Sequence, residues 1–520
     1  MNDFLNYTEI KEVLTPVEKI GQLFMPAAYI NDSELEIQKL ENLIRQHHVG
    51  GLCFFHSRAS AATNYEGKKK VIFNAESFKT LQKLIKRYQK ISKYPLVIAI
   101  DAEWGLAMRV ENTPQYPYAI TLGAIQKNIS LIYEMGKNIA HDCKVAGVHW
   151  NLAPCVDINN NPNNPVIGYR SFGEDKINVT EKALAFVKGT ESEGVLTSIK
   201  HFPGHGDTET DSHLGLPLIE KTKEELIANE LYPFQKLIEQ GVDSVMVGHL
   251  AIPALTEGKR ISSSLSKEII KDLLRKEMGF TGVVISDALN MHAVSKNYPE
   301  KGELEWLAFN AGNDILCFAE HIPEGITNIL KKGSQKQIEE SFERVWNLKQ
   351  KAIQASISRS DLNLKNADLV NRKIAESSLT IHKGTEEDIA TLSATNFCTL
   401  TIKRSIHTDV NANILDDLEK TRSEIKKERN ILVLLTPPKV KPEGYFGLLK
   451  EEIDFINELI QTKNVVLYLF GNPYALNHLN LENIKAAVVV YQDFKVFQDV
   501  ATDHFMGEIT AMGKLPVTIN

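Results

Sequence analysis

The sequence lacks any segment that would enter or cross a membrane. No run of about 18 consecutive apolar residues occurs in its 520 residues, so we expect no membrane span. Residues 1–16 contain no basic stretch followed by an apolar one, so we also expect no secretory signal. The expected location is the cytoplasm, or the periplasm or exterior if a signal has been removed.

Cysteine is scarce and basic charge is not in excess. The chain has five cysteines, and no two of them stand at C-x-x-C spacing. We therefore expect buried small side chains in a reducing compartment, with neither disulfides nor a cysteine metal site. The 59 Lys and Arg residues are outnumbered by 66 Asp and Glu residues, for a net charge of −7. Nucleic-acid binding needs a clustered basic face, so we expect no nucleic-acid partner.

The first 320 residues alternate short apolar runs with longer amphipathic stretches. Helical patterns lie between most runs, for example at 178–194 and at 266–279, where a Ser N-cap precedes and a Gly C-cap follows. Eight strand-like runs separated by helices predict an α/β fold with a (β/α)8 TIM-type barrel, and an open doubly wound sheet is the alternative. The runs are 20–27, 49–56, 95–101, 148–157, 196–205, 243–253, 282–291 and 312–319.

The pattern changes after residue 320. A charged, helical stretch leads to a crossover at 369–383, and a helix is expected at 451–461. We expect a barrel domain with a helical linker at 1–370, followed by a smaller α/β sandwich domain with a mostly parallel sheet at 371–520. Buried strands of the second domain are expected at 430–438, 464–476 and 486–493.

Polar residues stand where the apolar runs end. Barrel enzymes build their active sites from the carboxyl ends of the strands and the loops that follow. A charged group there is otherwise costly, because it lies beside a packed apolar core. The residues in such positions are Asp101, Asp157, His201, His249 and Asp287.

The segment KHFPGHGDTETDSHLGLP, residues 200–217, is the most unusual in the chain. Its Gly and Pro residues predict a mobile loop. Three interpretations compete: a divalent-metal site built from His and Asp, an Asp211–His213 dyad for proton transfer, or a polar surface loop. The titratable residues of the segment include Lys200, His201, His205, Asp207, Asp211 and His213.

Three further segments suggest sugar chemistry. Asp287 follows an apolar run and is either a nucleophile or the cap of the next helix. Asp101 would accept hydrogen bonds from vicinal hydroxyls, and Arg109 would donate them as a planar fork. Glu103 is at least equally suited to a structural ion pair. Arg170 lies in a turn-rich loop, where an anchoring salt bridge is the alternative to ligand binding.

The segment 200–217 closely resembles the signature of the NagZ-type β-N-acetylglucosaminidases within glycoside hydrolase family 3. Four further motifs support this resemblance in the family's order: Asp101 with Arg109, RSFGED (170–175), VGHLAIP (247–253) and SDALNM (286–291). By motif it covers roughly residues 10–320, and it extends more weakly to GKLPVTIN at the end. The family's acidic-Gly-Gly appears here as Glu103-Trp104-Gly105, and the second domain is short for the two-domain form.

The resemblance implies a role for each matching residue. Asp287 matches the nucleophile, and His213 matches the general acid/base with Asp211 as its partner. The residues that match those holding the terminal N-acetylglucosamine are Asp101, Arg109, Arg170, Lys200 and His201.

The reaction implied is a retaining hydrolysis through a covalent glycosyl-enzyme, with no metal or other cofactor. The implied substrate is a carbohydrate with a terminal β-linked N-acetylglucosamine, such as a muropeptide from cell-wall recycling, and chitin fragments are an alternative. A phosphorylase with the same Asp/His pair is the alternative reaction, since a His does not repel incoming phosphate. A metal-dependent hydrolase and a non-catalytic sugar-binding protein are less favoured.

Overall fold

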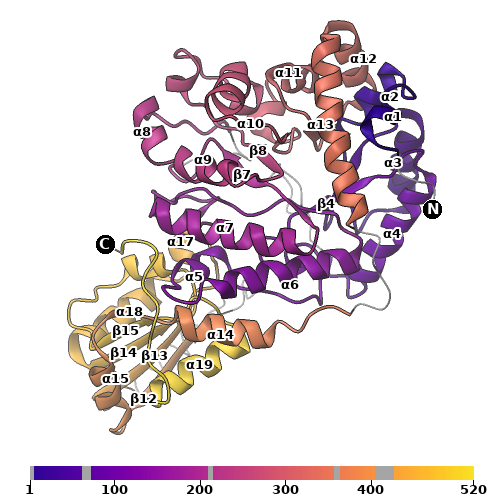
Figure 1. The fold of residues 1–520 in the computed structure, drawn as a ribbon. Helices are drawn as coiled ribbons and strands as arrows, with labels where there is room; N and C mark the ends of the chain where they lie inside the picture. Colours follow the sequence, from indigo (N-terminus) through magenta and orange to yellow (C-terminus); the bar gives the residue numbers. More distant parts are fainter. Residues whose placement is uncertain are drawn as a thin grey trace. The chain divides into compact units, whose positions relative to one another are not determined.

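The computed structural model describes residues 5–60, 72–208, 215–355, 363–404, 425 and 427–519. The chain forms two compact units (Figure 1). The first unit combines residues 1–116, 132–158 and 183–366, and the second combines residues 117–131, 159–182 and 367–520. Two stretches from within the sequence of the first unit therefore belong to the second.

Eight parallel strand runs build the first unit. The strand order is β2-β3-β4-β5-β6 in one sheet, β7-β8-β9 in another and β1-β10 in a third. Only Pro26 separates β1 from β2 and only Ser198 separates β6 from β7, so each of these runs joins two sheets. The strands are β1 Phe24–Met25, β2 Ala27–Tyr29, β3 Gly51–Phe55, β4 Val97–Ile100, β5 Trp150–Asn151, β6 Leu196–Thr197, β7 Ile199–Phe202, β8 Ser244–Val247, β9 Val283–Ser286 and β10 Leu316–Cys317.

The series of pairings returns to its start. A parallel bridge between Ile285 and Ile315 joins β9 to the run that contains β10, and β10 pairs with β1. Ser286 N donates to Ile315 O at 3.0 Å across this junction. The expectation of an α/β fold with a (β/α)8 TIM-type barrel is confirmed, and the open doubly wound sheet is excluded for this unit.

Helices follow most of the strands, and several of them begin at polar caps. Thr15 and Thr222 each form a capping box with the Glu three residues later. The helix expected at 266–279 spans Glu268–Glu277, and the Ser266 hydroxyl accepts a hydrogen bond from Ile269 N at 3.2 Å. The other main helices are α2 Pro16–Gly21, α3 Glu34–His47, α4 Ser77–Ile91, α6 Ser130–Ala146, α7 Lys176–Ser192, α8 Lys223–Ala228, α9 Leu231–Glu239, α10 His292–Ser295, α11 Glu303–Ala311, α12 Ile322–Lys332 and α13 Gln335–Gln354.

Figure 1 shows helices such as α4, α7 and α9 on the outside of strands β4, β7 and β8. These strands are buried along their whole length, which explains why their sequences are continuous apolar runs rather than alternating ones. Among the residues that the structure describes, no helix is both long enough and apolar enough to span a membrane.

The second unit is built on a five-stranded sheet in the order β11-β15-β14-β13-β12. All pairs are parallel except β11 with β15. Three of the strands and helix α18 Lys450–Thr462 match sequence expectations, whereas β11 and β12 were not expected. Figure 1 shows helices α14 Asp368–Ser378 and α19 Lys495–Phe505 in this unit. The strands are β11 Thr380–Lys383, β12 Cys398–Lys403, β13 Asn430–Thr436, β14 Asn464–Leu469 and β15 Ala486–Val489.

Candidate active site

The polar residues singled out in the first unit collect at the carboxyl ends of its strands. Asp101 directly follows β4, and Asp287 directly follows β9. Lys200 and His201 lie within β7, and His249 comes two residues after β8. Because all these strands are parallel, their carboxyl ends meet at one end of the barrel, where barrel enzymes hold their substrates.

Asp101 lies between two cations. Its Oδ1 is 2.8 Å from Lys200 Nζ, and its Oδ2 accepts a hydrogen bond from Arg109 Nη2 at 2.8 Å. Burial alone would raise the pKa of Asp101, but the charges of Lys200 and Arg109 hold that pKa well below its usual value. Asp101 is therefore an anion that still has lone pairs to accept hydrogen bonds from a ligand.

Lys200 also pairs with a second carboxylate, Glu103, at 2.7 Å. Only 2% of the Lys200 side chain is exposed, so this ion pair is shielded from solvent. The ion-pair interpretation of Glu103 therefore agrees with its contact. Arg109 is held from another side, because its guanidinium carbon lies 3.7 Å from the centre of the Phe55 ring.

Asp287 is a buried carboxylate that remains ionised. Its backbone N donates to Val247 O at 2.9 Å, and its Oδ1 accepts from Ala288 N at 2.8 Å. Burial would raise the pKa of Asp287, but the nearby His249 and His201, with the Ala288 N–H, lower it below the usual value. The capping alternative is wrong, because the N-cap of the following helix α10 is Met291. An ionised carboxylate at a strand end can attack an electrophilic carbon.

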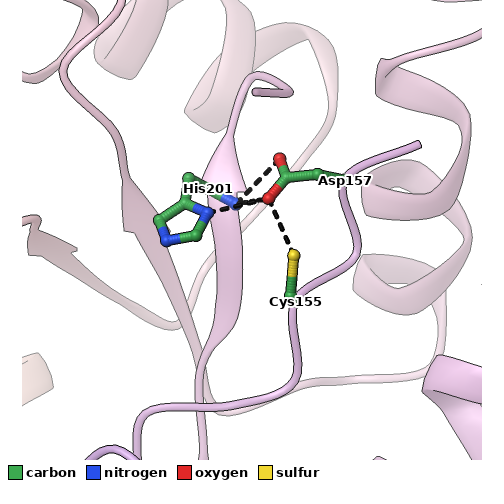
Figure 2. A group of neighbouring side chains, drawn as sticks. All are labelled: Cys155, Asp157 and His201. Carbon is green, nitrogen blue, oxygen red and sulfur yellow. Dashed lines mark hydrogen bonds and ion pairs between the residues drawn. The ribbon is translucent and has the colours of Figure 1, made fainter. Parts of the chain in front are cut away.

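His201 contacts a third carboxylate, Asp157 (Figure 2). The His201 Nδ1 is 2.7 Å from Asp157 Oδ2, and the Cys155 thiol donates to the same oxygen at 3.0 Å. Figure 2 shows both side chains pointing at the Asp157 carboxylate. Burial would raise the pKa of Asp157, but the hydrogen bonds that Asp157 accepts from His201 and Cys155 help to keep that pKa well below its usual value.

The metal interpretations find little support in these contacts. Ligand-type atoms of Cys155, Asp157 and His201 all lie within 4.8 Å of one another, a spacing that would suit a metal ion. The contacts between them, however, already fit N–H and S–H donors that share one carboxylate oxygen. In the loop itself, His205 Nδ1 is 2.9 Å from Thr208 Oγ1, and Asp207 pairs with Lys221 at 2.7 Å.

His249 is a residue of this region to which the sequence assigned no role. It is fully buried, with Nε2 at 2.9 Å from Ala288 O and Nδ1 at 2.8 Å from Ser264 Oγ. A carbonyl oxygen only accepts, so Nε2 carries a proton. In the sequence, the feature that marked His249 was its position after an apolar run. Its contact with the residue next to Asp287 depends on the pairing of β8 with β9.

Three further candidates from the sequence do not belong to the described part of the first unit. Arg170 belongs to the second unit, at the end of the short helix η2 Gly168–Arg170, and its Nη1 donates to Val166 O at 3.4 Å. Asp211 and His213 lie outside the described residues.

Comparisons with known proteins give results that are consistent with one another. A model described as the glycosyl hydrolase family 3 N terminal domain matches residues 15–348. The chain is 33% identical over 355 residues to beta-hexosaminidase A of Pseudoalteromonas piscicida, an alignment that covers 62% of this chain and 57% of that relative. The chain thus spans little more than half of that protein. It is 32% identical over 292 residues to a beta-hexosaminidase of Tolumonas auensis, covering 55% of this chain and 80% of the relative.

A solved structure is similar over nearly the whole chain. It is a glycoside hydrolase family 3 beta-N-acetylglucosaminidase from Paenibacillus sp. str. FPU-7. The two share 26% identity and a TM-score of 0.77, and the match covers 98% of this chain and 99% of the other.

Proposed function

The chain belongs to glycosyl hydrolase family 3, and we propose that it is a retaining exo-β-N-acetylglucosaminidase. The observation that carries this proposal is the ionised carboxylate of Asp287 at the same end of the barrel as the Asp101–Arg109–Lys200 cluster. The first supplies a nucleophile, and the second offers a fixed set of acceptors and donors for sugar hydroxyls. The names of the two hexosaminidase relatives and of the similar structure support N-acetylglucosamine as the sugar.

In the first step, an oxygen of Asp287 forms a bond to the anomeric carbon while the bond from that carbon to the leaving oxygen breaks. His213 gives its proton to the leaving oxygen. In the second step His213 takes a proton from water, the water oxygen bonds to the anomeric carbon, and the carboxylate of Asp287 leaves. Asp211 keeps the imidazole of His213 oriented, and such acid/base help contributes about 10²–10⁴ in rate.

The substrate sugar is held by the residues that resemble the family's binding set. In this proposal Asp101 accepts from hydroxyls, and the other contacts to the sugar come from Arg109, Lys200, His201 and Arg170. Each Asp101 oxygen already accepts from one cation, which fixes the carboxylate plane before the sugar arrives. The proposed natural substrate is a muropeptide of cell-wall recycling, which comparison of rates on an anhydromuropeptide and on chitobiose would test.

The decisive experiment uses an aryl N-acetyl-β-glucosaminide and an activated fluorinated analogue that accumulates the covalent intermediate. Wild-type enzyme should release the aryl group and should carry the sugar label on the peptide containing residue 287. Asp287→Asn should do neither, because an amide is a poor nucleophile. A label on another residue, or turnover by Asp287→Asn equal to wild type, would refute the proposal. Sugar phosphate in place of free sugar as the product in phosphate buffer would point to the phosphorylase alternative.

A further inference from the structure

Asp157 is the most heavily hydrogen-bonded carboxylate near the proposed site, and the proposed mechanism does not use it. Its side chain is fully buried. Its Oδ2 accepts from Cys155 Sγ and lies 2.7 Å from His201 Nδ1. Its Oδ1 accepts from the backbone N–H groups of His205, at 2.7 Å, and of His201, at 3.1 Å. One carboxylate therefore fixes a side chain of β7 and the backbone of the loop that follows.

The chemistry of this contact determines which nitrogen of His201 carries a proton. An ionised carboxylate only accepts hydrogen bonds, so Nδ1 must be the protonated nitrogen in the neutral ring. The other nitrogen, Nε2, then presents a lone pair on the side of the ring away from Asp157, the orientation that Figure 2 shows.

We propose that Asp157 is a positioning residue that holds His201 as the Nδ1–H tautomer, so that Nε2 accepts a hydrogen bond from a hydroxyl of the bound sugar. This inference rests on the proposed function, in which His201 contacts the sugar. The specificity follows from the tautomer: a sugar position that carries an O–H donor is favoured, and the same position without the hydroxyl is not.

The contacts of Asp157 make Asp157→Asn an informative change. The His205 N–H contacts Oδ1 alone, and the His201 N–H contacts both oxygens, so an amide oxygen on the Oδ1 side serves both. The amide NH₂ then faces His201 Nδ1 and the Cys155 sulfur, which can accept in place of donating. An NH₂ group donates, so Nδ1 must then offer its lone pair and the proton must move to Nε2. The substitution therefore reverses the tautomer while it keeps both backbone hydrogen bonds.

The reversal is measured directly by the ¹⁵N spectrum of histidine-labelled protein at neutral pH, with the His201 signals identified by their absence in His201→Gln. Wild type should show a proton on Nδ1 alone, and Asp157→Asn should show it on Nε2. A wild-type ring with the proton on Nε2, or on both nitrogens, overturns the inference. So does a proton that stays on Nδ1 in the variant.

Kinetics supply the second measurement, with aryl N-acetyl-β-glucosaminides lacking the 3-, 4- or 6-hydroxyl. We expect Asp157→Asn to lower kcat/KM on the parent substrate about 10- to 100-fold, because the hydroxyl that donates to Nε2 in wild type must reorient to accept from Nε2–H and gives up its preferred geometry. We expect no such loss on the one deoxy substrate that lacks the partner hydroxyl. An equal loss on all substrates indicates a merely structural role and overturns the inference.

A matched control is Asp142→Asn, at a buried aspartate in α6 whose Oδ1 accepts from Lys365 N at 2.8 Å. This variant should leave the tautomer of His201 and the deoxy-substrate pattern as in wild type. The two proposals fail separately. If the proposed function is wrong, the glycosides are not turned over but the tautomer still reverses; if this inference is wrong, turnover is normal and the tautomer does not reverse.

Discussion

Replacing Lys200 with Met tests whether the buried ion cluster both stabilises the barrel and keeps Asp101 charged. The ammonium group lies 2.8 Å from Asp101 and 2.7 Å from Glu103, and the exposed fractions of the three side chains are 2%, 18% and 7%. Met fills a similar volume but removes the charge. Two shielded carboxylates then lose the cation that they share, while Arg109 still pairs with Asp101.

Breaking a buried ion pair by removing one partner costs about 3–5 kcal/mol, and we expect the lower end because Arg109 remains. Glu103→Gln in the same chain removes one of the two carboxylate charges that lose this ammonium group. The double variant should therefore lose less stability than the sum of the two single variants, with a coupling of about 1–3 kcal/mol.

The assay is urea unfolding followed by tryptophan fluorescence. All four tryptophans, Trp104, Trp150, Trp306 and Trp346, belong to the first unit, so the signal reports on that unit alone. The pH dependence gives a second criterion. Lys200 helps to lower the pKa of Asp101, and a lowered carboxyl pKa adds stability above the unfolded pKa of about 4 that is lost as the pH falls. The gap between wild type and variant should thus be largest at neutral pH and should shrink below pH ~4.

Three results would refute this reasoning. One is a Lys200→Met loss below ~1 kcal/mol, the value typical of exposed pairs. Another is strict additivity of the two substitutions, since coupled charges must show an interaction energy. The third is a gap that stays constant across the acid range.

Two further predictions concern Lys349 and Arg109. Burial lowers the pKa of Lys349 to about 7, so between about pH 7 and 10 the unfolded chain holds a proton on this lysine that the folded chain lacks. The free energy of unfolding should therefore rise by about 4–5 kcal/mol as the pH increases through that window. Urea titrations at pH 6 and 10 should show this rise in wild type and not in Lys349→Met, and an equal rise in the variant would disprove the prediction. Arg109→Lys keeps the charge but loses the guanidinium hydrogen bond to Asp101 and the stacking on Phe55, so KM for the aryl glycoside should increase about 10-fold with kcat little changed. An unaltered KM would mean that the guanidinium group contributes nothing to binding.

Much of the barrel could be predicted from the sequence because each strand run is buried on both faces. Such runs are apolar throughout, as at 97–100 and 283–286, and the Gly and polar residues around them mark their ends. Strands β11 and β12 escaped prediction for a different reason. β12 alternates buried and exposed residues over 398–403, and β11 is short and polar, so neither forms a continuous apolar run.

The site was predictable where partners are close in the sequence. Asp101 and Arg109 are eight residues apart, and they do form a hydrogen bond. Asp157 stood out only as a carboxylate at a strand end. Its partner His201 lies 44 residues away, and the contact exists because the run after β5 bridges to β7 through Cys155 and Lys200. Such a partner is fixed by strand pairing, which periodicity does not reveal.

The ionisation of Asp287, the proposed nucleophile, also depends on the pairing of strands. Nothing in the motif around Asp287 lowers its pKa except the neighbouring Ala288 N–H; the other favourable contributions come from His249 after β8 and from His201 and Lys200 on β7. Without them, burial would favour the neutral acid, which is a poor nucleophile. The ionisation of Asp287 therefore depends on residues in or just after three strands, β7, β8 and β9, which the pairing of these strands brings together. For this reason a chain that kept the motif but lost His249, His201 and Lys200 would have a higher pKa at this aspartate.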